Sequence, residues 1–209
     1  MKGNRNIGII TYYQSDNYGE QLQAFAMLQL FEESALVKYR GKNISLRNHQ
    51  KMIAFLKKSD SLMQFLSVII DSMYTRICFS LFRKKYLMFC NAEECTSFIL
   101  GADQIWNTEI NNGDLFFFQN FSNAKTFAYA ASFGYDSFPK SYEKLVYPLF
   151  KRMEIIGVRE INGKTILKKQ FNKNSIIVLD PVFLISVEIW KDYYNLEIIE
   201  TKKKRLYIL

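Results

Sequence analysis

Short apolar segments alternate along most of this chain with longer stretches in which apolar residues recur every three or four positions. The short segments are typical of buried strands, and the longer ones are typical of amphipathic helices. The predicted strands are 7–10, 36–40, 97–101, 126–134, 155–158, 175–179 and 205–209. The predicted helices are a segment ending at Leu30, 52–86 with a break near 59–61, 140–154, 161–171 and 186–194. This alternation predicts an α/β fold: a mostly parallel, Rossmann-like sheet with helices on both faces. The aromatic segment 115–121 is expected to be core or an edge strand.

The stretch Ile7–Gln23 reads as the first strand, turn and helix of such a sheet. Its turn carries residues that suit a helix cap, namely Ser15, Asp16, Asn17 and Gly19. Free backbone N–H groups at a helix N-terminus favour anions. Any strand-to-helix turn needs a cap, however, so the pattern leaves open a binding loop and a plain connection.

Polar residues follow several of the predicted strands at the point where each one ends. They are Asp16, Asn17, Asp103, Gln104, Ser132, Arg159 and Asp180. A parallel sheet brings the carboxyl ends of its strands to one edge, where ligands of open α/β sheets bind. These side chains therefore predict a cleft for a polar ligand with phosphate or hydroxyl groups, such as a sugar.

The length and composition of the chain limit the class of protein. With 209 residues, 49% of them hydrophobic, it can form one domain with a full core. No secretory signal is apparent, and Gln64, Asp71 and Arg76 interrupt the most lipid-like stretch, 62–81. We therefore expect a soluble, cytoplasmic protein.

The ligand types for a metal site are sparse. Three cysteines, Cys78, Cys90 and Cys95, form no Cys-x-x-Cys pair, and His49 lies far from them. A structural zinc site needs four ligands at closer spacing. We expect no metal, and free thiols in a reducing compartment.

The net charge of +8 favours acidic partners. Lysines and arginines cluster at 83–85, 168–169 and 202–205, although each of these clusters can also be a solvated helix end or turn. No nucleic-acid motif accompanies the charge, so we expect no nucleic acid as a partner. The apolar face of the predicted helix 52–86 can pack on the sheet. Alternatively, with Arg76, Arg83, Lys84 and Lys85 beside it, the helix can touch a membrane.

Five blocks, in the same order along the chain, resemble the polysaccharide pyruvyl transferase family. The first is the opening strand with its Asn-Tyr-Gly-x-x-Leu-Gln turn, and the second resembles the family's Gly-Ser-Asp-Gln-x-Trp-Asn block. The blocks are 7–23, 98–107, 129–134, 158–160 and 179–184. The chain differs from the pattern at Ala102, where the family commonly has serine, and between Tyr86 and Ser97, which looks shortened.

The resemblance implies a fold like the N-terminal domain of the two-domain GT-B glycosyltransferases. It implies transfer of a pyruvyl group from phosphoenolpyruvate to two sugar hydroxyls, in the synthesis of an exopolysaccharide, capsule or cell-wall glycan. It further implies that residues 1–200 form the acceptor-side domain and that 201–209 begin a second domain. On that basis the chain is expected to be truncated and inactive alone.

Among the polar residues of these blocks, Asp103 is the candidate for proton transfer, with a capping role as the alternative. The candidates for substrate binding are Asn17, Tyr18, Gly19, Gln21, Gln104, Trp106, Asn107, Ser132 and Arg159. Trp106 can stack on a sugar or be buried, and Arg159 can bind a phosphate or pair with Glu160 or Asp180.

The expected partners are phosphoenolpyruvate as donor, with no further cofactor, and a sugar or lipid-linked glycan as acceptor. Peripheral contact with the inner face of the membrane is a further expectation. Two other functions stay open: a GT-B-like glycosyltransferase domain, and a non-catalytic glycan-binding module associated with membranes.

Overall fold

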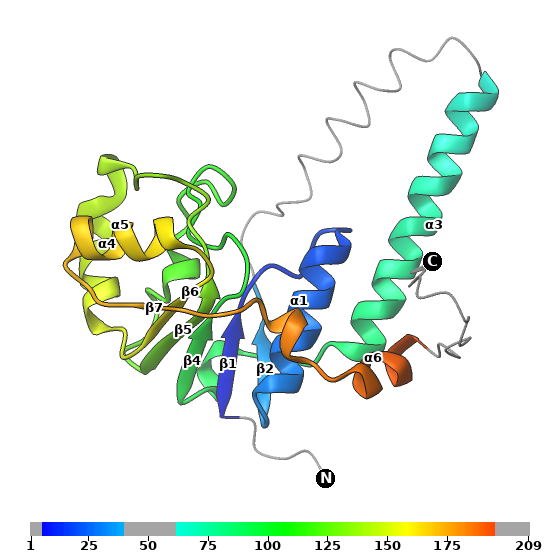
Figure 1. Cartoon of the computed structure of the whole chain (residues 1–209). Helices are drawn as coiled ribbons and strands as arrows, with labels where there is room; N and C mark the ends of the chain where they lie inside the picture. Colours follow the sequence, from blue (N-terminus) through cyan, green and yellow to red (C-terminus); the bar gives the residue numbers. More distant parts are fainter. Residues whose placement is uncertain (1–5, 40–61, 195–209) are drawn as a thin grey trace, which may run out of the picture.

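The computed structural model describes residues 6–39 and 62–194 and shows a single parallel sheet between two layers of helices (Figure 1). The strands are β1 (Ile7–Ile10), β2 (Ser34–Val37), β3 (Phe89–Cys90), β4 (Ser97–Leu100), β5 (Lys125–Ala131), β6 (Ile156–Val158) and β7 (Ile176–Ile177). The helices are α1 (Tyr18–Leu30), α3 (Leu62–Tyr86), α4 (Lys140–Arg152), α5 (Ile161–Phe171) and α6 (Val187–Tyr194). Three short 3₁₀ helices are η1 (Ala92–Glu94), η2 (Leu115–Phe118) and η3 (Pro181–Leu184).

The seven strands lie in the order β3-β2-β1-β4-β5-β6-β7, and every neighbouring pair is parallel. The strand order reverses between β1 and β4. This arrangement confirms the predicted Rossmann-like α/β fold. In such sheets a crevice for ligands opens at the point of reversal, outside the carboxyl ends of the strands.

Alternate strand residues face two separate cores, as strand geometry requires. Ile10 and Leu100 belong to a core under α4, α5 and η2, whereas Ile9 and Ile99 belong to a core under α1 and α6 and the C-terminal end of α3. Both sides of the sheet are therefore covered by helices.

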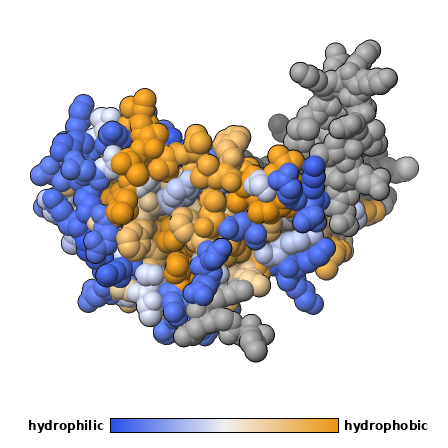
Figure 2. Space-filling model, turned by 60° about the horizontal axis from the view of Figure 1, so that its bottom comes forward, coloured by the Kyte–Doolittle hydropathy of each residue, from blue (hydrophilic) through white to orange (hydrophobic). Residues whose placement is uncertain are grey.

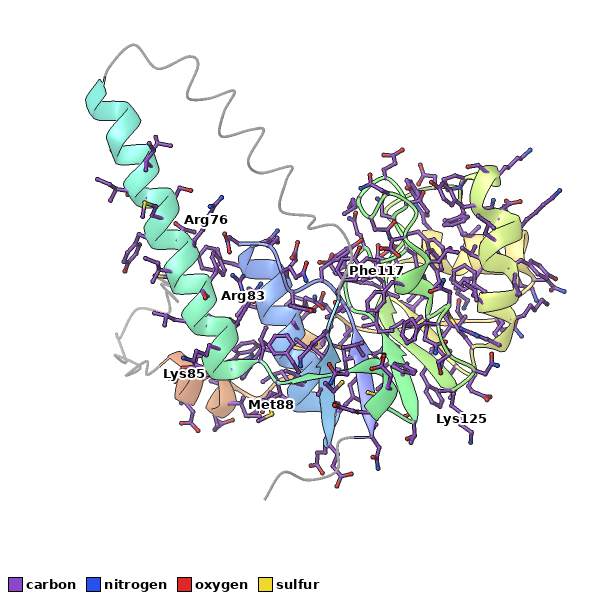
Figure 3. The ribbon with its side chains drawn as sticks, turned by 180° about the vertical axis from the view of Figure 1, so that it is seen from behind. Arg76, Arg83, Lys85, Met88, Phe117 and Lys125 are labelled. Carbon is purple, nitrogen blue, oxygen red and sulfur yellow. The ribbon has the colours of Figure 1, made fainter. Side chains whose placement is uncertain are left out.

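Helix α3 differs from the other helices because much of its length stands away from the body of the protein (Figures 1 and 3). It runs antiparallel to the strands, so that its N-terminal part projects beyond the carboxyl edge of the sheet (Figure 1). Its C-terminal end packs on α1 through the ring of Tyr86, 6.1 Å from that of Phe25.

Hydrophobic residues also gather in a broad area of the face shown in Figure 2, with hydrophilic residues around them. Exposed apolar side chains occur on β7 and in the segment that follows it, and include Ile176, Ile177, Leu179 and Phe183.

Most predicted elements are confirmed to within a few residues, and α5 matches its predicted range. The edge-strand interpretation of 115–121 is wrong, because Asp114 caps a 3₁₀ helix there and Phe117 and Phe118 are buried. Strand β3 was not predicted, since two residues carry no periodicity. Three features of the sequence lie outside the described residues: the part of the predicted helix 52–86 before Leu62, His49, and the predicted strand 205–209.

Candidate active site

The loops that follow β1 and β4 meet at the point where the strand order reverses. The loop after β1 carries Asn17 and leads into α1, whose first turn carries Glu20, while the loop after β4 carries Asp103. Two polar segments far apart in sequence thus share the crevice that this topology creates.

Asn17 caps α1, as the residues of the first turn predicted. Its Oδ1 accepts hydrogen bonds from the backbone N–H groups of Gly19 at 2.8 Å and Glu20 at 3.4 Å. Asn17, Tyr18 and Gly19 are exposed, and the Tyr18 ring lies 4.8 Å from that of Phe79 on α3. The turn therefore presents a capped helix N-terminus to solvent.

The other predicted residue of this turn, Gln21, is almost fully buried. Its Nε2 donates to the carbonyl oxygens of Tyr13 at 2.7 Å and Ser15 at 2.9 Å. Asp16, in the same turn, accepts from both terminal nitrogens of Arg83 at 3.2 Å. Gln21 is thus part of the scaffold that holds the turn, and this replaces its predicted role in substrate binding.

Asp103 lies immediately beyond β4 in a backbone conformation that residues other than glycine rarely adopt, with φ of 82°. The neighbouring Gly101 has φ of 126°, and a Cβ there would lie 1.9 Å from the carbonyl oxygen of Tyr129. The backbone of Asp103 pairs with β5, since its carbonyl accepts from the Ser132 N–H at 2.9 Å. Unusual backbone conformations of this kind cluster at functional sites.

The Asp103 carboxylate accepts a backbone hydrogen bond, and neighbouring charges influence its pKa. Its Oδ1 accepts from the Gln104 N–H at 2.7 Å. Burial raises the pKa of Asp103, the Gln104 hydrogen bond and the Arg159 charge oppose that rise, and the charge of Asp180 adds to it. The net upward shift makes this carboxylate a stronger base than an ordinary aspartate.

Gln104 and Asn107 lie on the same loop and touch each other. Asn107 Nδ2 donates to Gln104 Oε1 at 3.4 Å, while Asn107 Oδ1 accepts from the N–H groups of Glu109 and Ile110. Gly134, with φ of 65°, packs against both amides, and a Cβ there would lie 2.6 Å from Gln104 Oε1. Gln104 is half-buried and Asn107 is buried.

Trp106 does not face the crevice. Its side chain has no exposed surface. The centroid of its ring lies 4.9 Å from the ring centroid of Phe133 and 4.9 Å from that of Phe150. The prediction that it stacks on a sugar ring is therefore replaced by the alternative, a buried core tryptophan. The physical reason is the large apolar area of the indole, which is best removed from water.

Ser132, Arg159, Glu160 and Asp180 form a chain of polar contacts beyond β5 and β6. Ser132 is buried, and its Oγ donates to Glu160 Oε1 at 2.5 Å. Arg159 pairs with Asp180 at 3.0 Å and lies 3.9 Å from Glu160. The ion-pair alternative for Arg159 is thus observed, and Ser132 is engaged within the fold.

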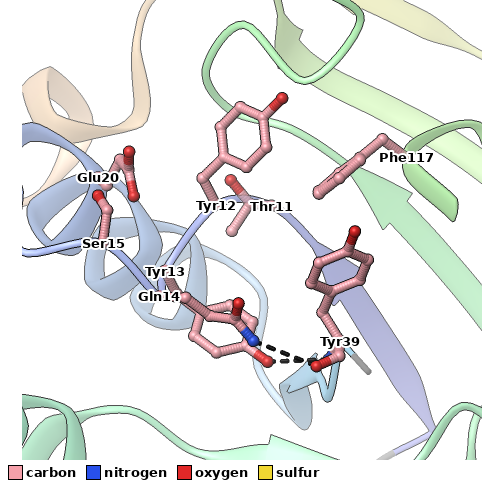
Figure 4. A pocket seen from close by; sticks show the side chains of 8 residues that line it. All are labelled: Thr11, Tyr12, Tyr13, Gln14, Ser15, Glu20, Tyr39 and Phe117. Carbon is pink, nitrogen blue, oxygen red and sulfur yellow. Dashed lines mark hydrogen bonds between the residues drawn. The ribbon is translucent and has the colours of Figure 1, made fainter. Parts of the chain in front are cut away.

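Glu20 is a candidate that the sequence reasoning passed over. It lines a pocket with Thr11, Tyr12, Tyr13, Gln14, Ser15, Tyr39 and Phe117 (Figure 4). Burial raises the pKa of Glu20, hydrogen bonds with Ser15 oppose the rise, and the negative charge of Asp103 adds to it. The signal that could have found it is a carboxylate in the first turn of α1, at a variable position of the Asn-Tyr-Gly-x-x-Leu-Gln block.

Glu20 and Asp103 are therefore two carboxyl groups whose pKa values are both raised, and the negative charge of Asp103 contributes to the rise at Glu20. Burial also raises the pKa of the Tyr12 hydroxyl, and the charges of Asp103 and Glu20 contribute to this rise. Pairs of titratable groups in such surroundings are typical of sites that transfer protons.

Comparison with known proteins adds one finding. A family model described as polysaccharide pyruvyl transferase matches residues 17–208, which includes Asn17, Glu20 and the loop after β4. No curated protein and no solved structure matches the chain significantly.

Proposed function

The chain belongs to the polysaccharide pyruvyl transferase family, and from that premise we propose that it transfers the pyruvyl group of phosphoenolpyruvate to a sugar. Two sugar hydroxyls add to the carbon that carries the phosphate. The methylene carbon gains a proton and becomes a methyl group, and phosphate leaves. The product is a cyclic ketal. The setting would be the synthesis of an exopolysaccharide, capsule or cell-wall glycan.

The single observation that carries the assignment of a site is the raised pKa of Asp103, a residue with an unusual backbone conformation at the reversal of strand order. The reaction needs a base for each attacking hydroxyl and an acid for the methylene carbon. We assign Asp103 to proton transfer with the sugar hydroxyl. Glu20 supports this role as a second carboxyl group with a raised pKa, and the negative charge of Asp103 contributes to that rise.

The acceptor would lie along the two loops of the crevice. Asn17 is exposed at its mouth, and Gln104 is half-buried beside Asp103, so that both amides can reach hydroxyl groups. Asn107 acts through Gln104, which it contacts. Arg159 is the basic residue whose charge acts on Asp103. We assign it to an anionic group of the donor, which would take the place of Asp180 as its partner.

The test is an assay for phosphate released from phosphoenolpyruvate, with mass spectrometry of the acceptor. Methyl glycosides of galactose, glucose and mannose serve as acceptors, because their O4 and O6 hydroxyls can close a six-membered ketal. Phosphate release together with the mass increment of a pyruvate ketal would support the proposed activity, and it would contradict the expectation that the chain is inactive alone. In Asp103→Asn the rate should fall by about 10²–10⁴-fold, the usual range for loss of an acid–base group.

A matched control is Asp192→Asn, which changes an exposed carboxylate on α6 and should leave the rate unchanged. Binding of the same glycosides, followed by ligand-detected NMR, provides a readout that does not depend on turnover. Turnover that survives in Asp103→Asn would contradict the catalytic assignment. Absence of both turnover and glycoside binding would contradict the proposed acceptor site.

A further inference from the structure

Helix α3 has two different faces along its described part. The inner face packs on the body of the protein: Phe79 is buried against Tyr18, and Tyr86 contacts Phe25. Arg83, at the edge of that face, pairs with Asp16 at 3.2 Å. These contacts hold the C-terminal end of α3 against the N-terminal turn of α1.

The opposite side, which we call the outer face, consists of apolar side chains that point away from these contacts. They are Ile70, Met73, Tyr74, Ile77 and Leu81. At 100° per residue they lie within an arc of about 100° on the helix, which is a typical apolar stripe. Each of them is 55–69% exposed. Burial of such a stripe against another surface would be favourable in proportion to its apolar area.

Basic residues are concentrated in the sequence of this helix and of the segment that precedes it. Residues 40–86 contain ten lysines and arginines and two aspartates, whereas the other 162 residues contain eighteen basic and eighteen acidic residues. The entire net charge of +8 therefore belongs to this segment. Lys84 and Lys85 are exposed at the C-terminal end of the stripe. An apolar stripe beside exposed lysines is the composition of helices that lie on anionic lipid surfaces.

Two other occupants fit the outer face less well. Seams between two helices usually combine flanking charges of both signs, but α3 has Asp71 as its one acidic residue against four basic ones. A second copy would therefore bring like charges together. A membrane-spanning role does not fit either, because no helix in the described ranges is apolar enough over sufficient length to cross a bilayer.

We propose that the outer face of α3 docks on an anionic membrane surface. The five apolar side chains enter the headgroup region, and Lys84 and Lys85 lie against lipid phosphates. The projecting helix is well placed for such a contact, since it stands away from the sheet (Figure 3). The inference does not depend on the catalytic role of Asp103.

The test is co-sedimentation of the chain with vesicles. Vesicles of equal parts phosphatidylcholine and phosphatidylserine should bind the chain, whereas vesicles of phosphatidylcholine alone should bind it at least tenfold more weakly. The double variant Ile77→Gln/Leu81→Gln should bind the mixed vesicles at least tenfold more weakly than the unchanged chain. Lys84→Gln/Lys85→Gln should weaken binding by about tenfold, and added salt should weaken it further.

The matched control is Leu145→Gln/Ile161→Gln, which removes two equally exposed aliphatic side chains from α4 and α5. Its vesicle binding should equal that of the unchanged chain. Because all four side chains are more than half exposed, both variants should melt at the same temperature as the unchanged chain.

A second readout uses Cys78, which is exposed on α3, while Cys90 is buried. Mixed vesicles should slow the reaction of Cys78 with a membrane-impermeant maleimide. Equal binding by the Ile77→Gln/Leu81→Gln variant and the control would overturn the proposal. So would a chain that binds no vesicles and is a dimer in solution, becoming monomeric in the Ile77→Gln/Leu81→Gln variant.

Discussion

The carboxyl edge of the sheet and the outer face of α3 differ in which side chains the fold engages and which it leaves exposed to solvent. At the edge, most of the polar side chains that the sequence pointed to are occupied by the fold itself: Gln21 holds the first turn, Ser132 bonds to Glu160, and Arg159 pairs with Asp180. On α3, apolar side chains are exposed to solvent. The difference indicates that the fold itself engages most polar side chains at the edge. The outer face of α3, in contrast, has exposed apolar area that suits a partner.

The largest effect on the free energy of unfolding is expected at Trp106, whose buried side chain fills the core beneath the edge. We expect Trp106→Ala to lower the free energy of unfolding by about 3–5 kcal/mol, because a large cavity forms among phenylalanines. The measurement is urea denaturation followed by circular dichroism. Ile77→Ala, on the outer face of α3, should change that free energy by less than about 0.5 kcal/mol. Similar losses in the two variants would contradict the comparison.

Removal of the Asn17 cap of α1 should lower the free energy of unfolding by a smaller amount. We expect Asn17→Ala to lower the free energy of unfolding by about 1 kcal/mol, since the N–H groups of Gly19 and Glu20 lose their acceptor. Denaturation midpoints measure the change. Asn17→Asp keeps an acceptor oxygen at a helix N-terminus and should retain the stability of the unchanged chain. An equal loss in the two variants would show that the cap does not account for the effect.

The smallest effect concerns the raised pKa of Glu20. A carboxyl group whose pKa is higher in the folded state binds its proton more tightly there, so its stabilising contribution is complete at low pH. That contribution is lost as the pH rises from the unfolded value, about 4.3, through the folded one. Glu20→Gln lacks this loss, and its stability relative to the unchanged chain should therefore increase from pH 4 to about pH 7.

Denaturation at a series of pH values measures this relative stability. A relative stability of Glu20→Gln that stays flat or decreases with pH would contradict the raised pKa. It would also remove the distinction between Glu20 and the exposed carboxylates.

Much of the fold could be predicted because local pattern and final structure agree. The apolar run of β1 and the helical periodicity of α5 each match one element. The prediction of parallel strands followed from their alternation with helices, and it placed Asp103 and Asn17 on the same edge. For residues 115–121 the edge-strand alternative was wrong and the core alternative was right, because Phe117 and Phe118 are buried in a 3₁₀ helix.

The candidate site could be predicted less completely than the fold. Residue type and position identified Asp103, but could not separate Trp106, which is buried, from Gln104, which is half-buried two positions earlier. Glu20 was missed because its pKa depends on burial and on Asp103, a residue 83 positions away. Neither influence is visible in a local pattern.

Residue order alone was enough to establish the α/β class, the polar ends of the strands and the family resemblance, since all three depend on local composition and spacing. The reversal of strand order between β1 and β4, the burial of Trp106 and the two faces of α3 were decided only by tertiary structure. The physical reason is that exposure and charge interaction depend on which segments pack together. That packing brings the turn after β1 into contact with the loop after β4 and with the inner face of α3, although these segments are far apart in the sequence.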